Sequence, residues 1–219
     1  MTPLNRRLIV AVIVLSSSTG TLVTGTAGAA SRRSSCAARV ASIAKTTDAG
    51  GRYARVARSG VVEVFSPTGS GFGAFHYVCR SRTGTVHRFA RNSGGASDHD
   101  VVTSSIAVRG PDVAYRTSVR DDGHGSERFV VRSGLTGRVL RDTGAVPSTE
   151  TGAPRTDQLV LLRQAAIAWA TRDAGVHVTD RDGDHTLEPP DGTQPTRLRA
   201  TATTLSWVRG GRRESVRLP

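Results

Sequence analysis

The strongest constraint on the fold is a repeat of short apolar segments in the second half of the chain. Each copy has an apolar run, a short turn and a second run containing an apolar, a small and an aromatic residue. These triplets are Val113-Ala114-Tyr115, Ile167-Ala168-Trp169 and Leu205-Ser206-Trp207. Nine residues before each aromatic stands another apolar residue, namely Ile106, Val160 and Leu198. Because side chains two positions apart share one face of a strand, this pattern predicts repeated antiparallel hairpins.

Further strands extend each hairpin into a larger unit. Third strands are expected at 85–89, 128–133, 176–179 and the C-terminal end, and fourth strands at 138–142 and 185–188. A looser early copy comprises 61–65 and Phe75-His76-Tyr77. Four strands in roughly 40 residues is the size of a β-propeller blade. The sequence therefore predicts an all-β fold of antiparallel four-stranded repeats, as in a small, incomplete propeller of about four blades. A β-sandwich or barrel of the same strands is the alternative.

The last copy stops after its third strand, which leaves an open sheet edge. In a closed propeller, a strand from the other end of the chain often completes such a blade. The segments "RVARSG", 55–60, and "VVEVF", 61–65, are the candidates for that role. Pairing there would cover an edge that otherwise invites association with other chains.

Three segments carry a resemblance to known proteins: "YVCRSRTGTVHRF", "AIAWATR" and "LSWVRGGRRESVRLP". They resemble a group of uncharacterised exported proteins of actinobacterial type and, more loosely, exported WD40-like or TolB-type propeller repeat proteins. The likeness covers most of residues 60–219. It implies a β-repeat fold and an exported protein, and it implies no activity because no catalytic motif accompanies it.

The first thirty residues have the layout of a secretory signal. Arg6 and Arg7 precede the apolar run "LIVAVIVL", and Ala27 and Ala29 form a small-x-small cleavage pattern. The run decays into Ser, Thr and Gly well before the roughly 20 apolar residues that a membrane span requires. We therefore expect a signal peptide at 1–30, no membrane span after cleavage, and a secreted, extracellular protein.

The segment 31–60 is expected to precede the β-repeat domain at 61–219. It contains "CAARVASIAK", 36–45, whose alanine-rich composition predicts one short helix. Cys36 and Cys79 are the two cysteines of the chain. An exported chain meets an oxidising environment, so an even pair without further metal-ligating cysteines predicts a disulfide.

The chain is strongly basic, with 30 Lys and Arg against 18 Asp and Glu and a formal net charge of +12. Only Lys45 is a lysine, and the arginines are spread along the chain, often beside acidic residues. Sparse aromatics disfavour nucleic-acid binding, which would use them to stack bases. The expected partner is an unknown protein or an anionic polymer of the cell envelope, and the expected state is a monomer.

Four polar residues in Gly-rich loops are the first candidates for chemistry: Asp98, His99, Asp121 and His124. They would serve a secreted hydrolase or lyase of propeller type, if loops from several blades bring them together. The stretch 178–188 places Asp180, Asp182 and Asp184 at alternate positions, as in a calcium loop. However, His185 stands where such a loop needs Gly, and Asp182-Gly183 is a strong hairpin dipeptide.

Ser70 stands among glycines, but not in the spacing of a hydrolase nucleophile. The sequence therefore assigns no catalytic residue, metal ligand or cofactor, and leaves the binding residues unknown. It favours an exported, non-enzymatic binding or structural module of the cell envelope or extracellular space. The loop-borne Asp/His enzyme is the alternative.

Overall fold

The computed structural model describes residues 35–47, 51–68, 73–91, 100–121, 124–148 and 158–218. The chain divides into two units, Met1–Arg32 and Arg33–Pro219, and every described residue belongs to the second. The expected signal peptide at 1–30, and the candidates Ser70, Asp98 and His99, lie outside the described residues.

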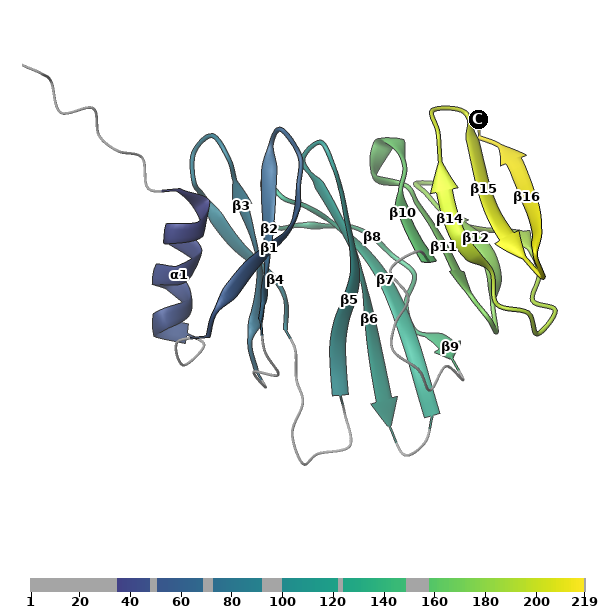
Figure 1. The fold of residues 1–219 in the computed structure, drawn as a ribbon, viewed down its shortest axis with the longest axis horizontal. Helices are drawn as coiled ribbons and strands as arrows, with labels where there is room; N and C mark the ends of the chain where they lie inside the picture. Colours follow the sequence, from purple (N-terminus) through teal and green to yellow (C-terminus); the bar gives the residue numbers. More distant parts are fainter. Residues whose placement is uncertain are drawn as a thin grey trace, which may run out of the picture. The chain divides into compact units, whose positions relative to one another are not determined.

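Among the described residues, the fold is all-β apart from an N-terminal helix and short 3-10 segments such as η2 (Arg163–Ala165) (Figure 1). Sheet 1 has the strand order β1-β2-β3-β4, and its strands are β1 (Tyr53–Arg58), β2 (Val62–Pro67), β3 (Phe75–Arg80) and β4 (Val86–Arg91). Sheet 2 has the path β5-β6-β7-β8 with β9 added beside β7, and its strands are β5 (Asp100–Arg109), β6 (Asp112–Asp121), β7 (His124–Ser133), β8 (Val139–Asp142) and β9 (Val146–Ser148).

Sheet 3 has the order β10-β11-β12-β13, and its strands are β10 (Leu159–Leu161), β11 (Ile167–Thr171), β12 (Gly175–Thr179) and β13 (Asp184–Glu188). Sheet 4 has the order β14-β15-β16, and its strands are β14 (Thr196–Ala200), β15 (Thr204–Arg209) and β16 (Arg212–Arg217). Neighbours along these paths pair antiparallel in chain order, so each sheet is a meander of local hairpins. The predicted four-sheet, antiparallel repeat is confirmed, and the sheets are not joined into one barrel.

The recurring aromatic of each repeat is buried, as its periodicity indicated. Tyr115 of sheet 2 packs with Val62, Val64, Val78 and Phe89 of sheet 1. Trp169 of sheet 3 packs with residues of sheet 2, and Trp207 of sheet 4 packs with residues of sheet 3. The Trp169 ring also stacks on Phe129 at a centroid distance of 4.7 Å. Each sheet after the first therefore packs one aromatic against the sheet that precedes it.

Helix α1 (Cys36–Thr47) covers sheet 1, the first of the described sheets, and confirms the helix predicted at 36–45. Its buried residues are Cys36, Val40 and Ala44, which lie on one helix face at spacings of four. They form a cluster with Tyr77 and Cys79 of β3. The predicted disulfide between Cys36 and Cys79 is present, with a Cα–Cα distance of 5.8 Å, and it fastens the helix to the sheet.

A buried charged pair lies where sheet 2 meets the entrance to sheet 3. Arg116 of β6 is only 2% exposed, and its Nη2 forms an ion pair with the carboxylate of Glu127 on β7. The Nη1 of Arg116 donates a 2.5 Å hydrogen bond to Oε1 of Gln158, just before β10. Removing one partner from such a pair costs about 3–5 kcal/mol, because the other charge stays buried.

The strand expected to complete the last sheet does not do so. The segment 55–58 belongs to β1 and residues 62–65 belong to β2, and these two strands pair with each other in sheet 1. A short hairpin closes this pairing at much lower entropic cost than a connection across the whole chain. Within the described part of the chain, no helix is long and apolar enough to cross a membrane.

Loss of the disulfide should lower the stability of the protein. The bridge joins residues 43 positions apart, and the chain-entropy model assigns a loop of that size about 4 kcal/mol. We expect the double variant Cys36→Ser, Cys79→Ser to melt roughly 10 °C below the native chain in calorimetry. Reductant should shift the native chain toward the variant and leave the variant unchanged. Equal melting temperatures for both proteins would contradict a stabilising bridge.

Candidate functional site

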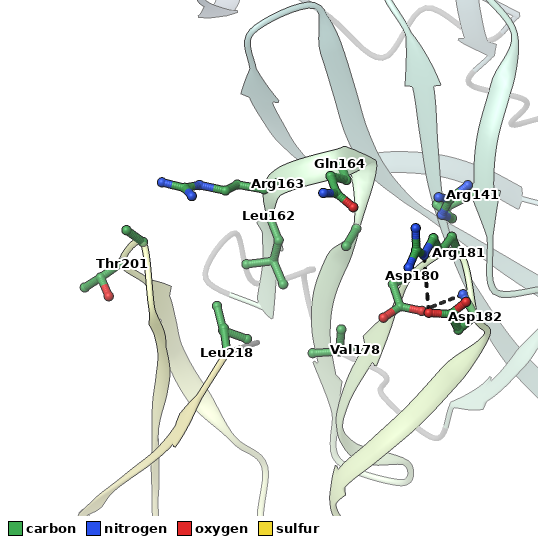
Figure 2. A pocket seen from close by; sticks show the side chains of 12 residues that line it. Arg141, Leu162, Arg163, Gln164, Val178, Asp180, Arg181, Asp182, Thr201 and Leu218 are labelled. Carbon is green, nitrogen blue, oxygen red and sulfur yellow. Dashed lines mark hydrogen bonds and ion pairs between the residues drawn. The ribbon is translucent and has the colours of Figure 1, made fainter.

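A pocket of about 380 Å³ lies between the turns of sheet 3 and the end of sheet 4 (Figure 2). Leu162, Val178 and Leu218 form its apolar part. Arg163 and Thr201 lie toward one end, and Arg141, Asp180, Arg181 and Asp182 gather at the other. The rim thus mixes both signs of charge around a small apolar floor.

The carboxylates at this rim are engaged in shaping a turn. The backbone N–H of Asp182 donates to Oδ1 of Asp180 at 2.7 Å, and His185 Nε2 lies 3.3 Å from the same oxygen. The pKa of Asp180 is lowered, first by the backbone N–H of Asp182 and then by His185. Asp184 accepts a hydrogen bond from the Thr179 hydroxyl at 2.8 Å and pairs with His177 at 2.8 Å.

The three aspartates therefore do not converge on a common point as a calcium loop requires. Among the described residues, no group of three His, Cys, Asp or Glu side chains is arranged to hold a metal ion. The backbone N–H of Asp180 instead donates to the Gly183 carbonyl at 2.9 Å, which closes the β12–β13 hairpin.

The other wall of the pocket carries a strained turn between β10 and β11. Gln164 and Ala165 both have positive φ, at 55° and 58°, where glycine or asparagine is favoured. The N–H of Ala166 donates to the Arg163 carbonyl at 3.0 Å and closes the turn. Gln164 is exposed and lines the pocket, while Ala165 is buried in the core.

A second hollow of about 370 Å³ lies on the face of sheet 4 turned away from sheet 3. Arg197 and Arg199 of β14 and Arg213 of β16 line it, together with Ser206, Trp207 and Val208 of β15. The register places Arg217 on the same face, because it lies opposite Thr204 and two positions from Ser215. We call this set the arginine face; its members are Arg197, Arg199, Arg213 and Arg217.

No carboxylate belongs to the arginine face. Glu214 is the one acidic residue in the three strands, and it lies opposite Trp207, whose side chain packs toward sheet 3. Arg199, Arg213 and Arg217 form no ion pair with any described residue. In contrast, Arg209 on the inner side of the sheet pairs with Glu188 at 2.8 Å and Asp191 at 3.4 Å.

A β-bulge shapes the arginine face at Arg197. The pairing of β14 with β15 shifts between Thr196 and Arg199, and Arg197 has a φ of 54°. Bulges bend a strand and change the direction of its side chains. An arginine at positive φ costs roughly 1–2 kcal/mol relative to ordinary backbone, and strain of this kind is often retained at functional sites.

Two of the four candidates for chemistry fall within the described strands. Asp121 ends β6 and His124 begins β7, and they are opposite one another in the register. The backbone thus brings Asp121 and His124 together at one hairpin, while Asp98 and His99 lie outside the described residues.

The sequence reasoning missed the arginine face. The alternation of Arg197, Leu198 and Arg199 was a readable signal of one charged and one buried side. This alternation did not identify an exposed charged face, because in the other three sheets neighbouring elements can cover both faces of a strand.

Comparisons with known proteins leave the function open. No protein-family model matches the chain, and no curated protein matches its sequence. Among solved structures, the chain is similar to one from a structural and mechanistic analysis of two prolyl endopeptidases. The identity is 13% and the TM-score 0.40, over 75% of this chain and 29% of that one. The chain thus matches less than a third of that neighbour, and we draw no conclusion from the likeness.

The Asp180 turn should contribute to stability in a pH-dependent way. Because the folded pKa is lowered from 3.8, the contribution is complete above that pH and fades as the pH falls through the folded value. We expect Asp180→Asn to unfold at lower urea concentration than the native chain at pH 6, with the gap closing toward pH 2.5. A gap of constant size across this range would contradict a role for the ionised carboxylate.

Proposed function

We propose that this chain is an exported, non-enzymatic binding module whose ligand is an anionic polymer of the cell envelope. In this proposal, residues 1–30 are a cleaved signal peptide, as the sequence pattern predicts, and the propeller-like domain predicted at 61–219 also includes β1 from the preceding segment 31–60. The disulfide supports the extracellular location, because such bridges persist in oxidising compartments.

The arginine face is the observation that favours an anionic polymer as the ligand. Three guanidinium groups border one hollow of about 370 Å³, and arginine matches phosphate groups with two parallel hydrogen bonds. The strand spacing of a sheet sets these groups in rows, so a polymer with repeated phosphates would meet several of them at once. Each single contact would be weak in salt water, and the sum would give useful affinity.

The phosphates of a teichoic-acid-like chain suit this surface better than nucleic acid does. Trp207 is the one aromatic of sheet 4, and its side chain is buried toward sheet 3. Trp207 also lines the hollow but is only 5% exposed, so the arginine face offers charge and hydrogen bonds with little ring surface on which bases could stack. Recognition of this kind reads the phosphate spacing and ignores the identity of the groups between phosphates.

Neutralising two residues of the arginine face should weaken polymer binding. We expect Arg199→Gln and Arg213→Gln each to lower the affinity for poly(glycerol phosphate) by about tenfold, the effect of one charged hydrogen bond. Calorimetric titration at two salt concentrations should also show a smaller salt dependence in the variants. Arg138→Gln is the matched control, because Arg138 is an exposed arginine of the β7–β8 turn with the same charge change. Equal losses in all three variants would indicate attraction by net charge alone.

The substitution Arg197→Gly should raise the stability of the protein and weaken its binding to the polymer. Glycine relieves the positive φ at the bulge, so we expect the free energy of unfolding to rise by up to about 1 kcal/mol. The same change removes a guanidinium and should weaken polymer binding about tenfold. Gln164→Gly is the control, because this exposed residue has a similar φ and lies outside the arginine face. It should stabilise the fold and leave binding unchanged; weaker binding in both variants would contradict a role for the Arg197 guanidinium.

The alternative is a secreted hydrolase or lyase with a loop-borne Asp/His site. Its one supporting observation is the register that sets Asp121 opposite His124. Hydrolysis of envelope glycans or esters by the native chain, abolished in His124→Ala, would favour the enzyme over the binding module.

A further inference from the structure

Sheet 4 has three described strands, whereas sheets 1 and 3 have four and sheet 2 has five. Strands β4, β8 and β13 form the fourth strand along the paths of sheets 1, 2 and 3, whereas no described strand pairs with the outer side of β16. Arg212 to Ser215 and Arg217 are exposed along this strand. The open edge lies beside the C-terminus, in the yellow part of the ribbon (Figure 1).

The hydrogen-bond pattern shows which backbone groups the open edge offers. The N–H of Leu218 donates to the Thr203 carbonyl at 2.8 Å, so these two residues form a hydrogen-bonded pair. Because hydrogen-bonded pairs alternate along the ladder, the backbone N–H and carbonyl groups of Glu214 and Val216 point toward β15. Those of Arg213, Ser215 and Arg217 point away from it. These three alternate residues thus present their N–H and carbonyl groups on the open side of β16.

We infer that β16 binds an extended, acidic segment of a partner protein, which adds to sheet 4 as its fourth strand. Strand addition is a common mode of peptide recognition, in which the backbone supplies affinity and alternate side chains supply specificity. This interaction shares Arg213 and Arg217 with the proposed polymer binding, but it also needs the backbone of the edge, which the polymer does not.

Charge complementarity identifies the partner as acidic. Strand β16 carries Arg212, Arg213 and Arg217 against the single Glu214. Acidic side chains directly opposite Arg213 and Arg217 would form favourable cross-strand pairs on the arginine face. On the other face, Val216 and Leu218 extend the core cluster of sheets 3 and 4, so apolar side chains are favoured there. The preferred segment therefore alternates acidic and apolar residues.

The same charges disfavour a second copy of this chain at the edge. Two β16 strands paired with one another would bring arginines of both copies close together, and like charges across strands destabilise a sheet. Charged residues on an edge strand commonly prevent self-association in this way. An acidic segment would instead be attracted to the arginines of β16.

The test uses the disulfide-bonded chain and a labelled peptide of alternating Glu and Val. A control peptide has the same composition with its Glu and Val residues in two blocks. We expect the alternating peptide to bind at least about tenfold more tightly in fluorescence anisotropy, because only it can pair both faces at once. Amide exchange followed by NMR should slow at Arg213, Ser215 and Arg217 when the peptide binds, and should change little at Glu214 and Val216.

Ser215→Pro removes the central outward N–H and keeps every arginine. It should reduce peptide binding by about tenfold or more and leave poly(glycerol phosphate) binding unchanged. Arg199→Gln should do the reverse, since β14 is not at this edge. The two variants therefore distinguish failure of strand addition from failure of the proposed polymer binding.

Equal binding of both peptides, without the alternating protection of amides, would overturn the inference and leave attraction by charge. A dimer in sedimentation that Ser215→Pro dissolves would overturn it in favour of a second copy. The exchange pattern of the native chain keeps the inference testable if the proline variant does not fold.

Discussion

Packing between successive sheets is the constraint on which the whole structure depends. A meander of three or four short strands has two faces and cannot bury an apolar face by itself. Here each sheet is stabilised by the one before it, through Tyr115, Trp169 and Trp207. Helix α1 occupies the corresponding place at sheet 1 and is fixed there by the disulfide. Sheet 4 is the last described sheet of this series, and its charged outer side is available for binding.

Much of this organisation could be predicted from the sequence, because it depends on local periodicity. The spacing of the aromatic triplets predicted the strands, and the two cysteines predicted the disulfide. Long-range features could not be predicted in the same way. Arg116 is a charged residue, which the sequence alone would place at the surface, and its contacts with Glu127 and Gln158 make its burial tolerable. The role of β1 as the first strand of sheet 1 depends on a choice between partners that periodicity does not encode.

The same distinction between local and long-range features applies to the candidate site. The alternation in β14 predicts that one side is charged, but which side stays open depends on which face of sheet 4 packs against sheet 3. The bulge at Arg197 likewise leaves no sequence signal, because glycine is the residue usually found at such a φ. The strained arginine thus departs from the usual residue preference in the same sheet that has an open edge, and local departures of this kind often mark functional regions.

The local order of the strands also affects how the chain can fold as it is delivered from its N-terminus. Every strand pair is a hairpin or near neighbour, so no sheet has to wait for a distant segment. Both cysteines lie within the first 79 residues, which means that α1 and sheet 1 can be cross-linked before sheets 2 to 4 emerge. The finished first sheet then offers a preformed surface on which the next can assemble. The disulfide can therefore act as a starting point for sequential folding as well as a clamp on the finished protein.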